Sequence, residues 1–349
     1  MNVLLVSVRS KESKGGIAVW TEPYITACES HGIHCDIVNT AKSGRRTLFN
    51  ELARARRIYR QLVSRLTSGT YDVVHFNTNI GYLGVIRDYG LAKRIHKQGI
   101  PIVLHFHCDI PYWVTNRLIH HYLKKILALS DLNFVLCEES HRYLQETFGV
   151  DSVKVANFVD ESLVVAHKPI QDVLRTICFV GRISRAKGAA ELYEVARRFP
   201  AITFRLVGRM QPDMADAPIP PNVVLVGTLS HDEVIVELDA ADAFLFPTHT
   251  EGFSLALAEA MARGLPCIAT DVGANADMLE DKGGIVVRKQ DTAAMQTAIE
   301  RLADPAVRRQ MSEWNRRKVR EQYTSSAILQ VFNEQYQAIR KQVNAHDNL

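Results

Sequence analysis

The sequence predicts an α/β protein that contains two domains, each with a doubly wound parallel sheet. A series of short apolar runs lacks alternation, as in parallel strands that are covered on both faces. Amphipathic helical stretches separate these runs and give the repeating strand–helix–strand pattern of α/β proteins. The chain has 349 residues, which is too long for one ordinary core and sufficient for two.

The predicted strands form two series, separated by a turn-rich stretch at residues 157–172. The first series is Val3–Val8, Asp72–Asn77, Pro101–Phe106 and Leu132–Leu136. The second series is Arg175–Val180, Ile202–Val207, Val223–Val226, Ala243–Phe246, Pro266–Ala269 and Gly284–Val287. Two predicted helices, Asp304–Tyr323 and Ser326–Gln342, have no strand after them, so they must cover a core that is already built. We therefore expect an N-terminal domain at 1–165, a second domain at 170–325, and a C-terminal helix, 326–349, packed back on the first domain.

The composition disfavours several classes of protein. Hydrophobic residues are 47% and charged residues 23% of the chain, as in globular proteins, and no apolar run approaches the roughly 20 residues that span a bilayer. The six cysteines are scattered without a C-x-x-C pair, which disfavours a zinc site or a disulfide framework. A net charge of +4 is too small to indicate a nucleic-acid partner. The first apolar run is too short for a signal peptide and lacks a basic flank, which predicts a cytoplasmic protein.

The sharpest motif follows a predicted strand of the second series. Glu251 precedes a nearly all-apolar helix that Ser254 can cap, and Glu259 lies within that helix. A buried carboxylate needs a partner, so we expect ribose hydroxyls of a nucleotide to bind Glu259. A structural ion pair with Arg263, one turn away, is the alternative. A phosphate or sugar oxygen would suit the free N–H groups at the helix start, those of Phe253, Ser254 and Leu255.

Three further features follow predicted strands. Arg182 and Lys187 lie on a loop bounded by glycines, where they are placed to clamp a diphosphate, and a solvated loop is the alternative. Gly15 and Gly16 would let the backbone approach a pyrophosphate closely. His107 ends a strand and is a candidate site group, with a core histidine as the alternative. Neither the Walker A spacing nor the G-x-G-x-x-G dinucleotide fingerprint is present.

These motifs resemble those of the family 4 glycosyltransferases, retaining enzymes of the GT-B fold that act in bacterial exopolysaccharide and lipopolysaccharide synthesis. The most specific sign is the pair Glu251 and Glu259, within F-P-T-H-T-E-G-F-S-L-A-L-A-E-A-M-A-R-G-L-P. The loop G-R-I-S-R-A-K-G resembles the family's phosphate loop, and Asn157–Asp160 resembles its turn between domains. The resemblance covers essentially the whole chain and implies two Rossmann-like domains that face a cleft, with C-terminal helices crossing back.

The resemblance implies an enzyme that moves a hexose-type sugar from a nucleotide-diphosphate sugar to a glycan or lipid-linked acceptor. It implies an N-terminal acceptor domain and a C-terminal donor domain, with His107 and Glu251 as catalytic residues. Positive charge on the loop would stabilise the departing nucleoside diphosphate, so neither a metal nor a cofactor is expected. The implied donor-binding residues are Gly15, Gly16, Arg182, Lys187, Phe253, Ser254, Leu255 and Glu259.

Rival interpretations come from inside and outside the fold. A nicotinamide-dependent Rossmann oxidoreductase is disfavoured by the missing dinucleotide fingerprint. A non-catalytic, membrane-associated binding protein is a second rival, which hydrolysis of a sugar nucleotide would exclude. The paired glutamates argue against a sugar-nucleotide epimerase, and a pyridoxal phosphorylase would need a much longer chain.

A basic stretch, Lys42–Arg65, contains Glu51 as its only acid. One helical stripe is predicted to be buried, namely Leu48, Leu52, Ala55, Tyr59, Leu62 and Leu66. The predicted opposite side carries Arg46, Arg54, Arg57 and Arg65. Attraction to anionic lipid, worth about 1 kcal/mol per basic residue near the surface, would place the protein peripherally on the inner face of the cytoplasmic membrane. An ordinary solvated helix face is the alternative.

Overall fold

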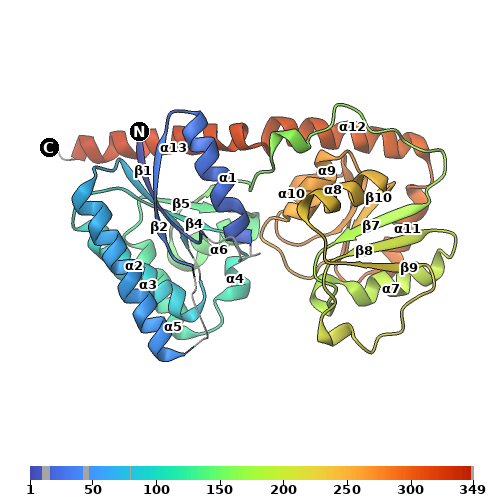
Figure 1. Ribbon diagram of the computed structural model, residues 1–349, viewed down its shortest axis with the longest axis horizontal. Coiled ribbons are helices and arrows are strands. Elements are labelled where there is room, and N and C mark those ends of the chain that lie inside the picture. Colours follow the sequence, from blue (N-terminus) through green and yellow to red (C-terminus); the bar gives the residue numbers. More distant parts are fainter. Residues whose placement is uncertain (10–15, 42–46, 79, 347–349) are drawn as a thin grey trace. The chain divides into compact units, whose positions relative to one another are not determined.

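A computed structural model describes residues 1–9, 16–41, 47–78 and 80–346, and it divides into two compact units. The first unit comprises Met1–Asn157 together with the C-terminal segment from Ser325, and the second comprises Phe158–Thr324. Each unit contains a six-stranded sheet in which the recorded strand pairs are all parallel. The predicted fold class, α/β with two doubly wound parallel sheets, is therefore confirmed (Figure 1).

The first unit has the strand order β2-β1-β3-β4-β5-β6. Its strands are β1 (Asn2–Ser7), β2 (His34–Asn39), β3 (Val73–Thr78), β4 (Ile102–Phe106), β5 (Leu132–Val135) and β6 (Val153–Lys154). Its helices are α1 (Gly16–Ser30), α2 (Leu48–Ser68), α3 (Tyr82–His96), α4 (Ile110–Trp113), α5 (Arg117–Leu127), α6 (Glu138–Phe148) and α13 (Ser325–His346).

Alternation along the strands divides the first unit's core into two faces. Leu4, Phe76 and Leu104 point to one face, where they join a cluster with α2, α3 and α5. The intervening residues of β3 and β4, which include His75 and His105, pack with aromatic residues of α1 and α13. Figure 1 shows α13 running beside α1 in this unit. Histidines are thus placed on the face that the C-terminal helix covers.

The second unit has the strand order β12-β11-β10-β7-β8-β9. Its strands are β7 (Thr176–Val180), β8 (Thr203–Val207), β9 (Val223–Gly227), β10 (Ala243–Phe246), β11 (Cys267–Thr270) and β12 (Gly284–Val287). Its helices are α7 (Ala189–Arg198), α8 (His231–Ala240), α9 (Leu255–Ala262), α10 (Asn275–Leu279), α11 (Thr292–Arg301) and α12 (Pro305–Gln322). Short 3-10 turns are η1 (Glu161–Leu163), η2 (Arg185–Lys187) and η3 (Pro212–Met214).

Helix α9 forms where the sequence predicted it. The Ser254 hydroxyl accepts a hydrogen bond from the Leu257 N–H group at 3.2 Å and caps the first turn. Gly264 ends the helix with a φ of 72°, a conformation that glycine adopts without strain. Leu257, Ala258 and Met261 are fully buried against the sheet and α12. The apolar composition of this helix therefore reflects burial on several sides.

Two strands escaped the sequence prediction. Strand β2 reads H-C-D-I-V-N, and Val38 is its only fully buried residue. It lies at the edge of the sheet beside β1, so the other five residues are at least partly exposed and no apolar run marks it. Strand β6 has two residues, too few to show a pattern.

The face assigned to α2 from the sequence is only partly right, because Leu62 and Leu66 of the predicted stripe pack on the core and Leu52 and Tyr59 do not. Ile58 and Leu62 are fully buried, whereas Leu52 is 63% exposed and Tyr59 45% exposed. Arg54 points inward instead of facing solvent, because its guanidinium donates at 2.5 and 3.1 Å to the carbonyl of Thr40, the residue that follows β2. Two apolar stripes share this helix, and only packing on the sheet selects between them. Lys42, Arg45 and Arg46 lie outside the described residues.

Candidate functional site

Loops that follow β7, β10 and β11 are tied together at the carboxyl edge of the second unit's sheet. The His249 N–H group donates to the Ala186 carbonyl at 3.0 Å, which joins the β10 loop to the β7 loop. The Ala274 N–H group donates to the Gly252 carbonyl at 2.8 Å, which joins the β11 loop to the same β10 loop. Open α/β sheets bind ligands at this edge, so these loops define the candidate site.

Two glycines permit the close approach of these loops. Gly188 has a φ of 72°, and a Cβ atom there would overlap the backbone carbonyl of Pro247. Gly273 has a φ of 57°, and a Cβ atom there would overlap the carbonyl oxygens of Glu251 and Gly252. Both positions combine a left-handed backbone with backbone–backbone contact, which only glycine satisfies. The loops are therefore held by steric fit as well as by hydrogen bonds.

The sequence-predicted residues Lys187 and Glu251 are in direct contact. The Lys187 ammonium donates to the Glu251 carboxylate and, at 3.4 Å, to the Thr250 carbonyl. The two side chains are 16% and 17% exposed, so the pair is only partly screened by water. Arg182 lies earlier on the same loop, exposed, with no ion pair recorded in the described part of the chain. One edge thus carries a neutralised ion pair and an unpaired cation.

The start of α9 also faces this edge. Within the described residues, no protein acceptor is recorded for the backbone N–H groups of Phe253, Ser254 and Leu255. Unpaired N–H groups at the positive end of a helix favour an anionic or sugar oxygen. The contact of these N–H groups with a phosphate or sugar oxygen stays a prediction.

Glu259 has a partner that the sequence did not indicate. The His231 imidazole, at the first position of α8, contacts the Glu259 carboxylate at 3.0 Å. The alternative ion pair with Arg263 does not form, because that guanidinium binds Asp239 at 2.6 and 2.7 Å and the Leu163 carbonyl at 3.0 Å. His231 follows β9 and so emerges at the same edge, which is the one sequence signal from which it could have been found.

His107 lies in the first unit, just after β4, and both of its ring nitrogens have partners. Nε2 is 2.9 Å from the Asn77 carboxamide oxygen, and Nδ1 is 3.1 Å from that of Asn157. Burial among aromatic and histidine rings lowers the pKa of His107 to about 3, so the ring is neutral near pH 7. A neutral imidazole has a single N–H donor, so its two neighbours must play different roles.

A chain of hydrogen bonds determines which nitrogen of His107 carries the proton. The Thr21 hydroxyl donates to the Ile17 carbonyl at 2.7 Å, so the Ser7 hydroxyl must donate to Thr21. The Asn77 amide group in turn donates to Ser7 at 2.8 Å and leaves its oxygen for His107. Nε2 therefore carries the proton and donates to the Asn77 oxygen, which leaves Nδ1 of the neutral ring without a proton beside the Asn157 oxygen.

A second series of buried side-chain contacts ends beside His107. The hydroxyls of Tyr24 and Tyr336 lie 2.8 Å apart, and Tyr336 contacts His75 at 2.5 Å. His75 contacts His105 at 3.3 Å, and the His105 ring lies 3.9 Å from that of His107. Burial lowers the pKa of His75 to about 3 and that of His105 as well. The sequence assigned no role to His105, and the structure places it in the aromatic core.

Asp109 lies two residues beyond His107 and has an unusual environment. Its carboxylate oxygen Oδ1 is buried without a hydrogen-bond partner among the described residues. Burial, followed by the nearby charge of Glu139, raises the pKa of Asp109 to about 6. Cys137 brings its sulfur within 4.8 Å of both carboxylates, although no separate observation points to a ligand there.

The glycine pair of the first unit is only partly described. Gly15 lies outside the described residues, and Gly16 is the first residue of α1. Their expected contact with a diphosphate therefore stays a prediction, as does the catalytic role of His107.

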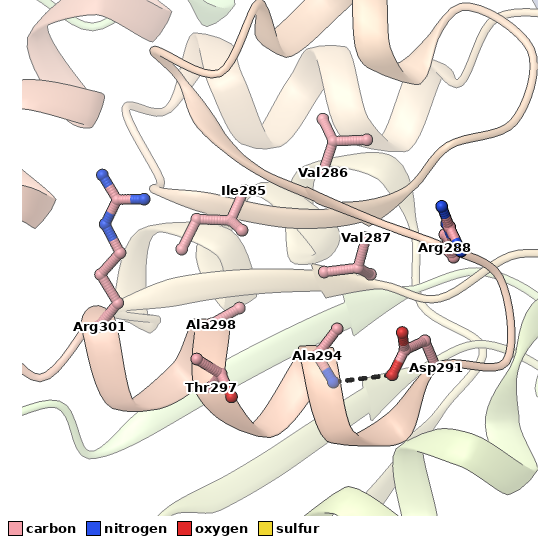
Figure 2. A pocket seen from close by; sticks show the side chains of 9 residues that line it. All are labelled: Ile285, Val286, Val287, Arg288, Asp291, Ala294, Thr297, Ala298 and Arg301. Carbon is pink, nitrogen blue, oxygen red and sulfur yellow. Dashed lines mark hydrogen bonds between the residues drawn. The ribbon is translucent and has the colours of Figure 1, made fainter.

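A separate cavity of about 540 Å³ lies between β12 and α11 (Figure 2). Its lining contains none of the predicted site residues. The Asp291 carboxylate accepts a hydrogen bond from the Ala294 N–H group at 2.9 Å and caps α11, which explains its presence there. Arg288 and Arg301 lie at opposite ends of the lining shown in Figure 2. This cavity belongs to the open edge of the sheet, apart from the joined loops.

Comparison with known proteins decides the family. Residues 17–163 match the family described as Glycosyltransferase Family 4, and residues 174–304 match Glycosyl transferases group 1. The second match includes every candidate donor residue from Arg182 to Glu259. The chain belongs to the family 4 glycosyltransferases. Glu251 and Glu259, on which the resemblance mainly depended, lie within the part that matches.

The names of this chain's curated relatives indicate different substrates. The capsular polysaccharide biosynthesis glycosyltransferase CapM of Staphylococcus aureus is 29% identical over 243 residues, covering 66% of this chain and 61% of that protein. The N-acetyl-alpha-D-glucosaminyl L-malate synthase of Bacillus anthracis is 26% identical over 272 residues, covering 70% of each. The phosphatidyl-myo-inositol mannosyltransferase of Mycobacterium tuberculosis is 27% identical over 243 residues, covering 64% of this chain and 61% of that protein. The chain thus spans less than two thirds of the length of CapM and of the mannosyltransferase.

Solved structures share the fold. A sucrose-phosphate synthase from Thermosynechococcus elongatus has a TM-score of 0.80 at 19% identity, covering 97% of this chain and 98% of that chain. HepE of Anabaena, solved in complex with UDP, has a TM-score of 0.73 at 15% identity, covering 97% and 100%. At these identities the likeness shows the GT-B fold, and it leaves substrate and acceptor open.

Proposed function

We propose that this family 4 glycosyltransferase is a retaining enzyme that transfers a hexose-type sugar from a nucleotide-diphosphate sugar. The acceptor is a glycan or a lipid-linked acceptor in the synthesis of a surface polysaccharide or glycolipid. The observation that carries the proposal is the Lys187–Glu251 pair, which joins the β7 and β10 loops at the carboxyl edge of the sheet. The names of CapM and of the phosphatidyl-myo-inositol mannosyltransferase support the class of acceptor.

The site's charges suit a donor that carries both a diphosphate and hydroxyls. Lys187 would turn from Glu251 to the diphosphate, and Arg182 would add a second cation. The freed Glu251 carboxylate would accept hydrogen bonds from the sugar. As the bond to the sugar breaks, negative charge grows on the departing diphosphate, and these cations together with the N–H groups at the start of α9 stabilise it. The acceptor attacks from the same face, and the leaving phosphate takes its proton.

The proposal predicts that a nucleotide sugar binds, and that it turns over without a divalent metal. UDP-, GDP- and ADP-sugars should be screened by thermal unfolding, since a ligand at 100 times its Kd adds about 2.7 kcal/mol of stability. The stabilising donor should then be hydrolysed slowly, and more rapidly when an acceptor is present. Excess EDTA should leave the rate unchanged, because Arg182 and Lys187 neutralise the diphosphate. Proton NMR should show that the first-formed sugar keeps the anomeric configuration of the donor.

A parallel preparation of Lys187→Ala controls for contaminating hydrolases and should be nearly inactive. Binding without turnover under every condition would favour a non-catalytic binding protein. If EDTA abolished activity and magnesium or manganese restored it, the role assigned to Arg182 and Lys187 in neutralising the diphosphate would be wrong. Inversion at the anomeric carbon would contradict the retaining mechanism.

We infer that α2 brings the enzyme to an anionic membrane through a face different from the one the sequence suggested. Phe49 is 79% exposed, and Leu52 and Tyr59 are exposed on the same side. Arg56 and Arg60 lie among them, exposed, with no ion pair recorded in the described part of the chain. Aromatic and aliphatic groups beside arginines suit the boundary between lipid headgroups and acyl chains. Among the helices of the described residues, none is long and apolar enough to cross a membrane.

Vesicle co-sedimentation tests this surface. The protein should bind vesicles containing phosphatidylglycerol and ignore those of phosphatidylcholine alone. Binding should weaken with salt, because the screening length falls from about 10 Å at 0.1 M to about 3 Å at 1 M. Arg56→Gln with Arg60→Gln should lose roughly 2 kcal/mol, about 30-fold in affinity. The matched control removes two exposed cations elsewhere in the unit, Lys97→Gln with Arg142→Gln, and should bind normally. Equal vesicle binding by both double variants would show that α2 is an ordinary solvated helix.

A further inference from the structure

Glu259 and His231 form a pair across two helices of the second unit. His231 opens α8 and Glu259 lies midway along α9, 28 residues further on. The histidine side chain is 57% exposed and the glutamate side chain 15% exposed. The start of α8 is fixed by a reciprocal capping box. The Ser230 N–H group donates to the Glu233 carboxylate, and the Glu233 N–H group donates to the Ser230 hydroxyl. The imidazole is therefore presented to Glu259 from a rigid point of the fold.

The pairing leaves part of the Glu259 carboxylate free. His231 Nε2 lies 3.0 Å from Glu259 Oε1, and no partner is recorded for Glu259 Oε2 among the described residues. Arg263 is held by Asp239 and so does not compete for Glu259. One carboxylate oxygen is thus anchored by a ring nitrogen, while the other remains available to a hydroxyl donor.

We propose that His231 is the positioning residue that aims Glu259 at the ribose of the donor, and that its protonation tunes donor affinity across neutral pH. This inference rests on the proposed function, because it assigns a role within the same donor site. Anchoring Oε1 restricts the rotamers of Glu259, so less conformational freedom is lost when Oε2 accepts a ribose hydroxyl.

The charges that face His231 set the sign of the pH dependence. Its hydrogen bond with Glu259 is the largest cause that raises the pKa of His231, and the carboxylates of Asp232 and Asp160 add to it. Asp232 lies on α8 itself, and Asp160 lies just before η1. Below the raised pKa, an imidazolium gives a charge-assisted anchor and attracts the anionic donor. As pH rises through that pKa, both contributions fall, so donor affinity should fall as well.

Calorimetry with UDP-glucose, GDP-mannose and ADP-glucose from pH 6 to 8.5 tests the proposal. These donors are suitable because a diphosphate that is esterified at both ends does not titrate in this range. Wild-type affinity should fall about fivefold with rising pH, the difference between a charge-assisted and a neutral hydrogen bond. His231→Ala should bind more weakly with a flat profile. His231→Gln should recover part of the affinity and remain flat, since its amide donates without titrating.

A donor that lacks the ribose 2′ or 3′ hydroxyl separates positioning from a direct contact with base or phosphate. Wild type should discriminate against at least one deoxy donor, and His231→Ala should lose most of that discrimination. Exposed His167 provides the control, since His167→Ala should keep the wild-type profile. An unchanged profile in His231→Ala, or an equal loss for ribose and both deoxy donors, would overturn the role of His231 while leaving the proposed function intact. Failure of the wild type to bind any of the three donors would overturn the proposed function and this inference together.

Discussion

Glu251→Ala is expected to abolish sugar transfer while leaving the affinity for nucleoside diphosphate nearly intact. In the structure this carboxylate holds the Lys187 ammonium. Without it, Lys187 keeps its hydrogen bond to the Thr250 carbonyl and its contact with the Phe246 ring, and its ammonium is free to meet a diphosphate. The loss should therefore appear in turnover, by about 10²–10³-fold if Glu251 acts only on the sugar as the bond breaks.

Glu259→Ala should show the opposite pattern. Loss of hydrogen bonds between ribose and a charged group should cost roughly 1.5–3 kcal/mol of nucleotide affinity. Lys187→Ala should also weaken the nucleotide, because it removes a cation and leaves Glu251 as an unpaired negative charge beside the diphosphate. The three variants thus separate a sugar contact, a ribose contact and a phosphate contact.

Titration with nucleoside diphosphate, beside turnover of the full donor, measures this division. Glu251→Gln serves as the isosteric control, since it keeps the size of the side chain and loses the charge that binds Lys187. Equal losses of nucleotide affinity in the alanine variants at Glu251 and Glu259 would contradict the assignment of separate roles.

Gly188→Ala is expected to destabilise the second unit by about 2–5 kcal/mol. A left-handed backbone costs about 1–2 kcal/mol for a residue with a Cβ atom. The added methyl would also overlap the Pro247 carbonyl, and overpacking of this kind typically costs about 1–3 kcal/mol. Relief of the overlap must move the β7 loop away from the β10 loop, so Lys187 should lose Glu251 and nucleotide affinity should fall too.

Gly149→Ala is the matched control for this variant. Gly149 has φ 67° and ψ 27°, close to the 72° and 23° of Gly188, but no atom lies within 4 Å of its would-be Cβ. It should therefore show the conformational cost alone. Hydrogen exchange of peptides from each unit in rising urea measures the two stabilities separately. Equal destabilisation by both substitutions would show that the contact with Pro247 is not a constraint.

The sequence by itself determined the elements whose signal is local. Ala243–Phe246 and Gly284–Val287 are strands with the bounds that apolar runs predicted, because strands buried on both faces need apolar side chains throughout. Helix α9 could also be predicted, because it is buried on several sides and therefore apolar, with Ser254 as its cap and Gly264 at its end. The paired glutamates stood out because polar groups in such an apolar segment require an explanation.

The tertiary structure alone decided which distant groups meet. Lys187 and Glu251 are 64 residues apart, and His231 and Glu259 are 28 apart, so no short-range period links either pair. Edge strand β2 was hidden because half-exposed strands need no apolar run. On α2, two apolar stripes compete, and Arg54 points inward because it donates to the carbonyl of Thr40, the residue that follows β2. Local pattern sets which residues tend to be buried, whereas the partner of each polar group depends on how the packed elements bring backbone and side chains together.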